Sequence, residues 1–151
     1  MEVTINQRIE EFFDRYEARL SGALADTPEI NIEATASAFT ACFIEANPNG
    51  VLCGQNDDQF RAQIPSGFEF YRTIGTKSMK IVSLDITPLD AFHSMAKVHW
   101  EARYVKKDGS KDMIDFDVIY FLQTLGNDPK IFAYIAGDEQ KVMRERGLIP
   151  G

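Results

Sequence analysis

The apolar residues of this chain change their spacing near Gly75, and no other feature of the sequence constrains the fold as strongly. Before Gly75 they recur every three or four residues, which is typical of helices that bury one stripe. After Gly75 they alternate with polar residues, which is typical of half-buried strands. Helices first and strands second predict an α+β fold with a mainly antiparallel sheet.

The first half of the sequence predicts three helices. Thr4 and Gln7 have the spacing of a capping box at the start of the first, and Asn-Pro-Asn-Gly at 47–50 ends the second. Pro65 should kink or divide the third, because proline cannot donate a backbone hydrogen bond. The apolar stripes are, in order, Ile5, Ile9, Phe12, Phe13, Tyr16 and Leu20; Ile32, Ala36, Phe39 and Phe43; and Phe60, Ile64, Phe68 and Tyr71.

The second half predicts about four strands and a short C-terminal helix. The strands are expected at 80–87, 92–106, 111–124 and 130–137, and Asp138 is the expected N-cap of the final helix. No repeat, low-complexity stretch or linker interrupts the chain, so residues 1–151 should form a single domain. We therefore expect N-terminal helices on one face of a curved sheet, enclosing an apolar pocket.

The charge of the chain argues against two classes of partner. The net charge is −7 and the isoelectric point is about 4.8, so phosphate backbones and anionic lipid headgroups would be repelled. We expect neither nucleic-acid binding nor membrane binding. Acidic residues interrupt every apolar run near the N-terminus, which predicts neither a signal peptide nor a membrane span.

The two cysteines, Cys42 and Cys53, suit a reducing compartment and favour a cytoplasmic location. Cys42 lies beside Phe43 in a helical pattern, so we expect it to be a small core residue rather than a nucleophile.

The hairpin around Lys107-Asp108-Gly109 has two plausible registers. A two-residue loop would place Trp100 opposite Asp117, which puts carboxylates on the apolar face at a cost of several kcal/mol each unless they are paired. A three-residue loop pairs Lys106 with Ser110 and sorts apolar from polar side chains cleanly. We prefer the second register, in which Trp100 lies on the helix-covered face.

The other face of the hairpin carries charges together with Met95, Ile119 and Phe121. Large apolar residues on a polar face are typical of a subunit contact, so we expect a homodimer through this face. Scattered surface hydrophobic residues are the alternative.

The layout of the chain resembles the nuclear transport factor 2-like superfamily, and in particular its SnoaL-like branch. The resemblance spans the helical first half, the long hairpin and the closing strand. Its local sequence echoes are 99–104 (HWEARY), 115–120 (DFDVIY) and 131–139 (IFAYIAGDE). It implies a cone-shaped, cystatin-like fold with a cavity between helices and sheet, and frequent dimers. It also implies functions divided among isomerases, cyclases, dehydratases and non-enzymatic modules, among which the fold alone does not choose.

His99 and Asp117 are the candidate catalytic pair. In the preferred register they face each other across the hairpin, where the carboxylate could orient the imidazole as a general base. That register places them on the face away from the cavity, so a surface or interface ion pair is the alternative. In the other register Asp117 would lie against Trp100 with a raised pKa, as an acid or base would need.

The expected ligand-binding residues offer an apolar body with an O–H or N–H group, or a plain aromatic ring. Plain core packing is the alternative for each. They are Trp100, Tyr104, Phe116, Tyr120, Tyr71 and Tyr134.

No metal or cofactor site is expected. His93 and His99 face the same way in one strand but would stand about 20 Å apart, too far to share an ion. Glycine-rich phosphate loops and zinc-ligand spacings are absent from the sequence.

Three functions remain open at this point. The chain could bind a small apolar molecule, with or without acting as a cofactor-free isomerase, dehydratase or cyclase. The alternative is a protein-interaction or dimerisation module without catalysis. A titratable side chain inside the cavity would favour the enzyme.

Overall fold

The first helix begins at a capping box, as its sequence predicts. The computed structural model describes residues 3–126 and 128–151. At the start of α1 (Ile5–Leu24) the backbone N–H of Gln7 donates to Thr4 Oγ1 at 3.1 Å, and that of Thr4 donates to Gln7 Oε1 at 2.9 Å. The two bonds satisfy N–H groups that a helix start leaves without partners. The helix then buries Ile9, Phe12 and Phe13 against the sheet.

The expected second helix is wrong in its second half. Only α2 (Ile32–Ser37) is helical, and β1 (Phe39–Asn47) and β2 (Gly50–Gln55) follow as an antiparallel hairpin. Phe39 and Phe43 are four residues apart, a spacing that fits a helix turn and also two steps along one face of a strand. Cys42 is exposed on this hairpin, so the expectation that it would be a core residue is wrong. Cys53 is also exposed.

The third helix is continuous, so Pro65, which was expected to kink or divide it, does not divide it. α3 (Asp58–Thr73) is capped by the carboxylate of Asp57, which accepts from the N–H of Phe60 at 3.0 Å, and Pro65 lies inside it. The chain then turns at Gly75, which has a φ of +95°. A Cβ at this position would lie 2.1 Å from the carbonyl oxygen of Val105, so both conformation and space demand glycine.

The sheet has six strands rather than about four. β3 (Thr76–Pro88), β4 (His93–Val105), β5 (Lys111–Gln123) and β6 (Lys130–Ile135) follow α3, and α4 (Glu139–Glu145) follows β6. The strand order is β2-β1-β6-β5-β4-β3. All neighbours are antiparallel except β1 and β6, which are parallel. The predicted α+β class, the antiparallel hairpins and the short C-terminal helix are confirmed.

The hairpin register that sorts apolar from polar residues is confirmed. Trp100 pairs with Phe116, and His99 pairs with Asp117. Lys106 donates its N–H to the carbonyl of Ser110 at 2.8 Å, and Gly109 adopts a φ of +84° in the three-residue loop. The rejected register, with Asp117 beside Trp100, is wrong.

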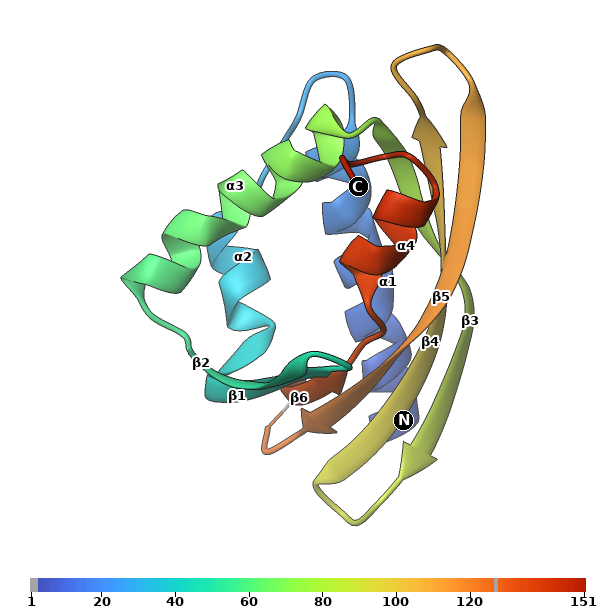
Figure 1. Ribbon diagram of the computed structural model, residues 1–151. Helices are drawn as coiled ribbons and strands as arrows, with labels where there is room; N and C mark the ends of the chain where they lie inside the picture. Colours follow the sequence, from blue (N-terminus) through green and yellow to red (C-terminus); the bar gives the residue numbers. More distant parts are fainter. Residues whose placement is uncertain (1–2, 127) are drawn as a thin grey trace.

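The helices cover the inner face of the curved sheet, and β3, β4 and β5 form its long arm (Figure 1). At the irregular point of β3, the N–H of Ile81 donates to Glu17 Oε2 of α1 at 2.5 Å, which ties the helix to the strand. No helix within residues 3–126 and 128–151 is long and apolar enough to cross a membrane.

Trp100 lies at the centre of the core with 1% of its surface exposed, beside the fully buried Val98. Replacing Trp100 with alanine should therefore lower the free energy of unfolding by about 3–5 kcal/mol, because removal of a large buried side chain leaves a cavity. Chemical denaturation followed by circular dichroism measures this loss. Val82→Ala on the exposed surface of β3 serves as the control and should change stability by no more than about 0.5 kcal/mol. A loss of similar size in both variants would contradict the central position of Trp100.

Candidate ligand pocket

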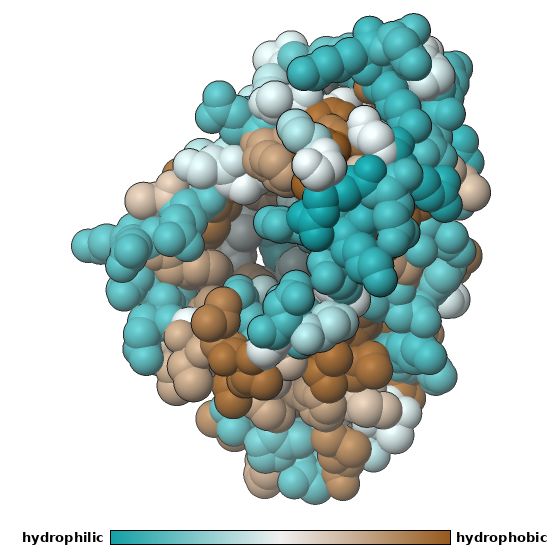
Figure 2. All heavy atoms as spheres, viewed as in Figure 1, coloured by the Kyte–Doolittle hydropathy of each residue, from teal (hydrophilic) through white to brown (hydrophobic). Residues whose placement is uncertain are grey.

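A cavity of about 560 Å³ lies between the inner face of the sheet and the helices α1, α3 and α4. Its volume is in the range of small-molecule sites. Figure 2 shows the molecule hollowed between α3 and α4. Aromatic and aliphatic side chains make up most of the lining. They include Tyr16, Leu20, Phe39, Phe60, Ile64, Phe68, Met79, Ile114, Val118, Val142 and Met143.

The wall on the sheet side is a cluster of aromatic rings. Trp100 Nε1 donates to Tyr120 Oη at 3.2 Å, and the ring of Tyr16 lies 6.1 Å from each of these rings. Trp100 borders the cavity beside Tyr16 and Tyr120, and with 1% of its surface exposed it has no broad face open to a ligand. Burial raises the pKa of Tyr16 and Tyr120, so both hydroxyl groups stay neutral at physiological pH.

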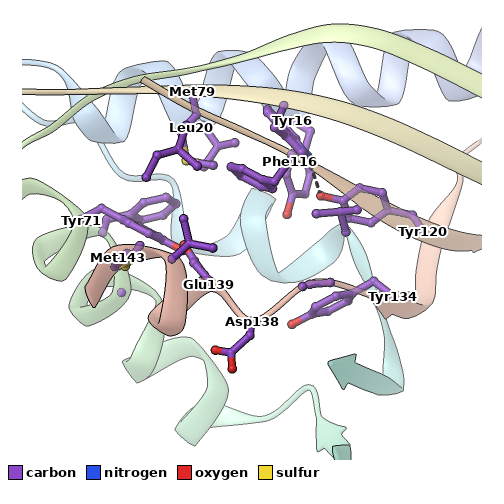
Figure 3. Close-up of a pocket in the computed structure, with 18 of the residues that line it drawn as sticks. Tyr16, Leu20, Tyr71, Met79, Phe116, Tyr120, Tyr134, Asp138, Glu139 and Met143 are labelled. Atoms are coloured by element: carbon purple, nitrogen blue, oxygen red, sulfur yellow. Dashed lines mark hydrogen bonds between the residues drawn. The ribbon is translucent and has the colours of Figure 1, made fainter. Parts of the chain in front are cut away.

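The opposite wall holds a carboxylate that faces the cavity. Tyr71 of α3 donates its Oη–H to Glu139 Oε1 of α4 at 2.7 Å, and Figure 3 shows the two side chains meeting beside the pocket. Glu139 is an exposed residue that lines the cavity. Desolvation by the neighbouring side chains still raises the pKa of its carboxyl group, and the hydrogen bond from Tyr71 partly offsets this rise. Burial, followed by the charge of Glu139, raises the pKa of Tyr71. The same two causes raise the pKa of Tyr104 to about 12.

A second tyrosine–carboxylate pair lies on the side formed by β6 and β1. Tyr134 donates its Oη–H to Glu45 Oε1 at 2.5 Å. Burial, followed by the hydrogen bond to Glu45, raises the pKa of Tyr134. Tyr134 lines the cavity, whereas Glu45 is outside its lining. Both pairs place a hydroxyl group in apolar surroundings with its donor hydrogen satisfied.

All six expected ligand-binding residues line this cavity. Tyr71 comes from α3, and Trp100 and Tyr104 come from β4. Phe116 and Tyr120 come from β5, and Tyr134 comes from β6. Alternation along the strands places five of them on the inner face, and Tyr71 lies on the apolar stripe of α3. Their role in binding a ligand stays a prediction.

The candidate catalytic pair lies on the outer face of the sheet. His99 Nδ1 is 2.6 Å from Asp117 Oδ1 and His99 Nε2 is 3.1 Å from Asp115 Oδ2, and both partners are exposed. Two hydrogen bonds raise the pKa of the His99 imidazole, the larger effect coming from Asp117 and the smaller from Asp115. The hydrogen bond with His99 in turn lowers the pKa of the Asp117 carboxyl group. Carboxylates on both ring nitrogens favour a charged imidazolium, which is a poor general base.

Sequence reasoning missed Glu139, the carboxylate that does face the cavity. It immediately follows Asp138, which was expected to cap the last helix and does accept from the N–H of Lys141 at 3.1 Å. An acidic residue in a first helical turn is ordinary, because it complements the helix dipole. Its position therefore gave no signal for a site. The described residues contain no cluster of three potential metal ligands.

The comparisons with known proteins agree with this fold. The family model described as NTF2-like protein (DUF6841) matches residues 6–139. The chain belongs to this NTF2-like family. A search of curated protein sequences gives no significant match.

Solved structures share the fold at low sequence identity. An NTF2-like protein of unknown function from Shewanella oneidensis MR-1 superposes with a TM-score of 0.66 at 12% identity, covering 89% of this chain and 100% of that chain. The beta subunit of benzoate 1,2-dioxygenase from Burkholderia mallei gives 0.65 at 12%, covering 95% of each chain. A putative calcium/calmodulin-dependent protein kinase II association domain from Xanthomonas campestris gives 0.62 at 16%, covering 89% of this chain and 88% of that chain. The membership confirms the expected superfamily, and placement in its SnoaL-like branch stays a prediction.

Proposed function

We propose that this protein binds a small, largely apolar molecule in the cavity beneath its helices. The observation that carries this proposal is the cavity itself, which stays open although aromatic side chains surround it. The cavity opens at the surface between α3 and α4, so a ligand can enter it. A ligand that fills the cavity would remove its apolar lining from water, which is favourable.

A cofactor-free proton-transfer enzyme is the second candidate, and Glu139 favours it. A carboxylate whose pKa is raised by apolar surroundings, next to a bound ligand, has the setting of a general acid or base. His99 and Asp117 do not support this candidate, because they lie on the other face of the sheet. The protein is thus a binder whose catalytic step, if it exists, would use Glu139.

Gly67 offers a way to close the cavity without disturbing the core. It lies in α3 and lines the pocket, and a Cβ at this position would meet no atom within 4 Å. Gly67→Phe should therefore fold, occupy the cavity and abolish binding of flat apolar compounds such as steroids. The neighbouring Ser66 is exposed and outside the lining, so Ser66→Phe is a matched control that should bind like the wild type.

Binding is measured by the fluorescence of Trp100, the only tryptophan, which borders the cavity. We expect a saturable change in the wild type and in Ser66→Phe, and none in Gly67→Phe. Equal responses in all three proteins would show that the compounds bind elsewhere. No response in the wild type to any apolar compound would overturn the proposed function and favour an interaction module.

We also propose that two copies associate through the outer face of the sheet. An apolar patch there, the outer patch, consists of Ile44, Val51, Met95, Ile119, Phe121, Phe132 and Ile135. Strand register makes it continuous, since Met95 pairs with Phe121 and Ile119 with Ile135, and Ile44 and Ile135 are each more than 40% exposed. Apolar residues gather over β1, β2 and β6 in Figure 2. The association domain among the structural neighbours is further support.

Phe121→Glu should convert the dimer to a monomer near 17.1 kDa, because it places a charge in the middle of the outer patch. Analytical ultracentrifugation at micromolar concentration measures the change. Met113→Glu is the control, since Met113 is exposed on the same face but pairs with Arg103, about 26 Å along the strands. A monomeric wild type, or a dimer that survives Phe121→Glu, would contradict this assembly.

A further inference from the structure

Apart from the tyrosines, four residues of the cavity lining have charged side chains, and Asp115 is one whose side chain lies with His99 on the outer face of the sheet. All but one of the four have a charged or structural partner. Arg146 Nη1 lies 2.9 Å from Asp112 Oδ1, and Asp115 lies 3.1 Å from His99. Asp138 accepts the backbone N–H of Lys141 as the cap of α4. Glu139 is different, because among the described residues its carboxylate has only the neutral hydroxyl of Tyr71 as a partner.

Glu139 is an exposed residue, so an incoming group can reach its carboxylate. The one bond from Tyr71 occupies a single oxygen and leaves the second oxygen of Glu139 open to another donor. The ion pairs among the described residues do not include Glu139. A cation that enters with the ligand would supply the missing partner.

The aromatic lining also favours a cation. Tyr71, Tyr134, Phe39 and Phe60 contribute rings to the cavity, and the faces of aromatic rings attract positive charge. The same fold already shows such a contact, because the guanidinium carbon of Arg19 lies 5.6 Å from the centroid of Tyr16. A carboxylate-bearing ligand would instead face Glu139 and a chain with a net charge of −7.

We propose that the cavity selects a ligand with an apolar body and a protonated amine, and that the amine binds the carboxylate of Glu139. This inference rests on the proposed function, since it assumes that the cavity is a ligand site. Tyr71 holds the carboxylate by one oxygen and leaves the other for the amine. The aromatic rings enclose the apolar body.

Three probes of one shape separate charge from hydrophobicity: phenylbutylamine, phenylbutanol and phenylbutyrate. Titration calorimetry of the whole chain gives the dissociation constant of each. We expect the amine to bind at least about tenfold more tightly than the alcohol, because a charge-assisted hydrogen bond replaces a neutral one. Phenylbutyrate should bind most weakly.

Two variants test the role of Glu139. Glu139→Gln keeps an acceptor for Tyr71 but removes the charge, so the amine and the alcohol should then bind about equally. Glu45→Gln removes the same charge from the other tyrosine–carboxylate pair, outside the lining, and should keep the preference for the amine. The alcohol should bind the wild type and both variants with similar affinity.

The outcomes distinguish this inference from the proposed function. If the wild type binds the alcohol as tightly as the amine, the inference is wrong and the proposed function stands. If Glu45→Gln loses the preference as fully as Glu139→Gln, the net charge of the protein is responsible and the inference is again wrong. If none of the three probes binds, the proposed function fails together with the inference.

Discussion

The burial of the inner face of β4 and β5 beneath α1 is the interaction on which the rest of this structure depends. Trp100 and Val98 of β4 lie under Ile9, Phe12 and Phe13 of α1, all within one core cluster. Side chains on a strand alternate between faces, so burying Trp100 inside places His99 and Asp117 outside. One packing contact thus sets the hairpin register, assigns charges to the outer face and leaves the aromatic residues beside the cavity.

The cavity exists because the helices cover the inner face unevenly. α1 packs directly on the sheet, while α3 and α4 stand over the other part of it and close the space from the side (Figure 1). The parallel pairing of β1 with β6 closes the end and brings Phe39 and Tyr134 to the lining. Two tyrosine hydroxyl groups in the lining donate hydrogen bonds to carboxylates, Tyr71 to Glu139 and Tyr134 to Glu45. Their hydrogen bonds allow tyrosine to line an apolar site.

The alternation of apolar and polar residues predicted β3 to β6 and the register of the β4–β5 hairpin, because only one register keeps charged side chains out of the core. A shift of one residue would have turned Asp115 and Asp117 into the core, at several kcal/mol each. The β1–β2 hairpin was missed since a four-residue spacing of Phe39 and Phe43 is compatible with helix and strand alike. A helix there would also have removed two strands from the sheet. Local sequence did not decide between them; pairing with the distant β6 did.

Local sequence likewise predicted some residues of the candidate site and missed others. The six aromatic residues could be predicted, since five of them lie on strands whose alternation fixes their face and Tyr71 lies on the apolar stripe of α3. Glu139 could not, because its role depends on the approach of α4 to Tyr71, 68 residues earlier in the chain. His99 and Asp117 met every local criterion for a catalytic pair, and only their face of the sheet excluded them from the cavity.

The methionine methyl groups locate a ligand most directly, because they sample both faces of the sheet. Met79 and Met143 line the cavity, whereas Met95 and Met113 lie on the outer face. In a ¹³C-methyl NMR titration with an apolar ligand, the signals of Met79 and Met143 should shift saturably while those of Met95 and Met113 stay in place. Shifts confined to Met95 and Met113, or no shifts at all, would contradict the account of the cavity as the functional site.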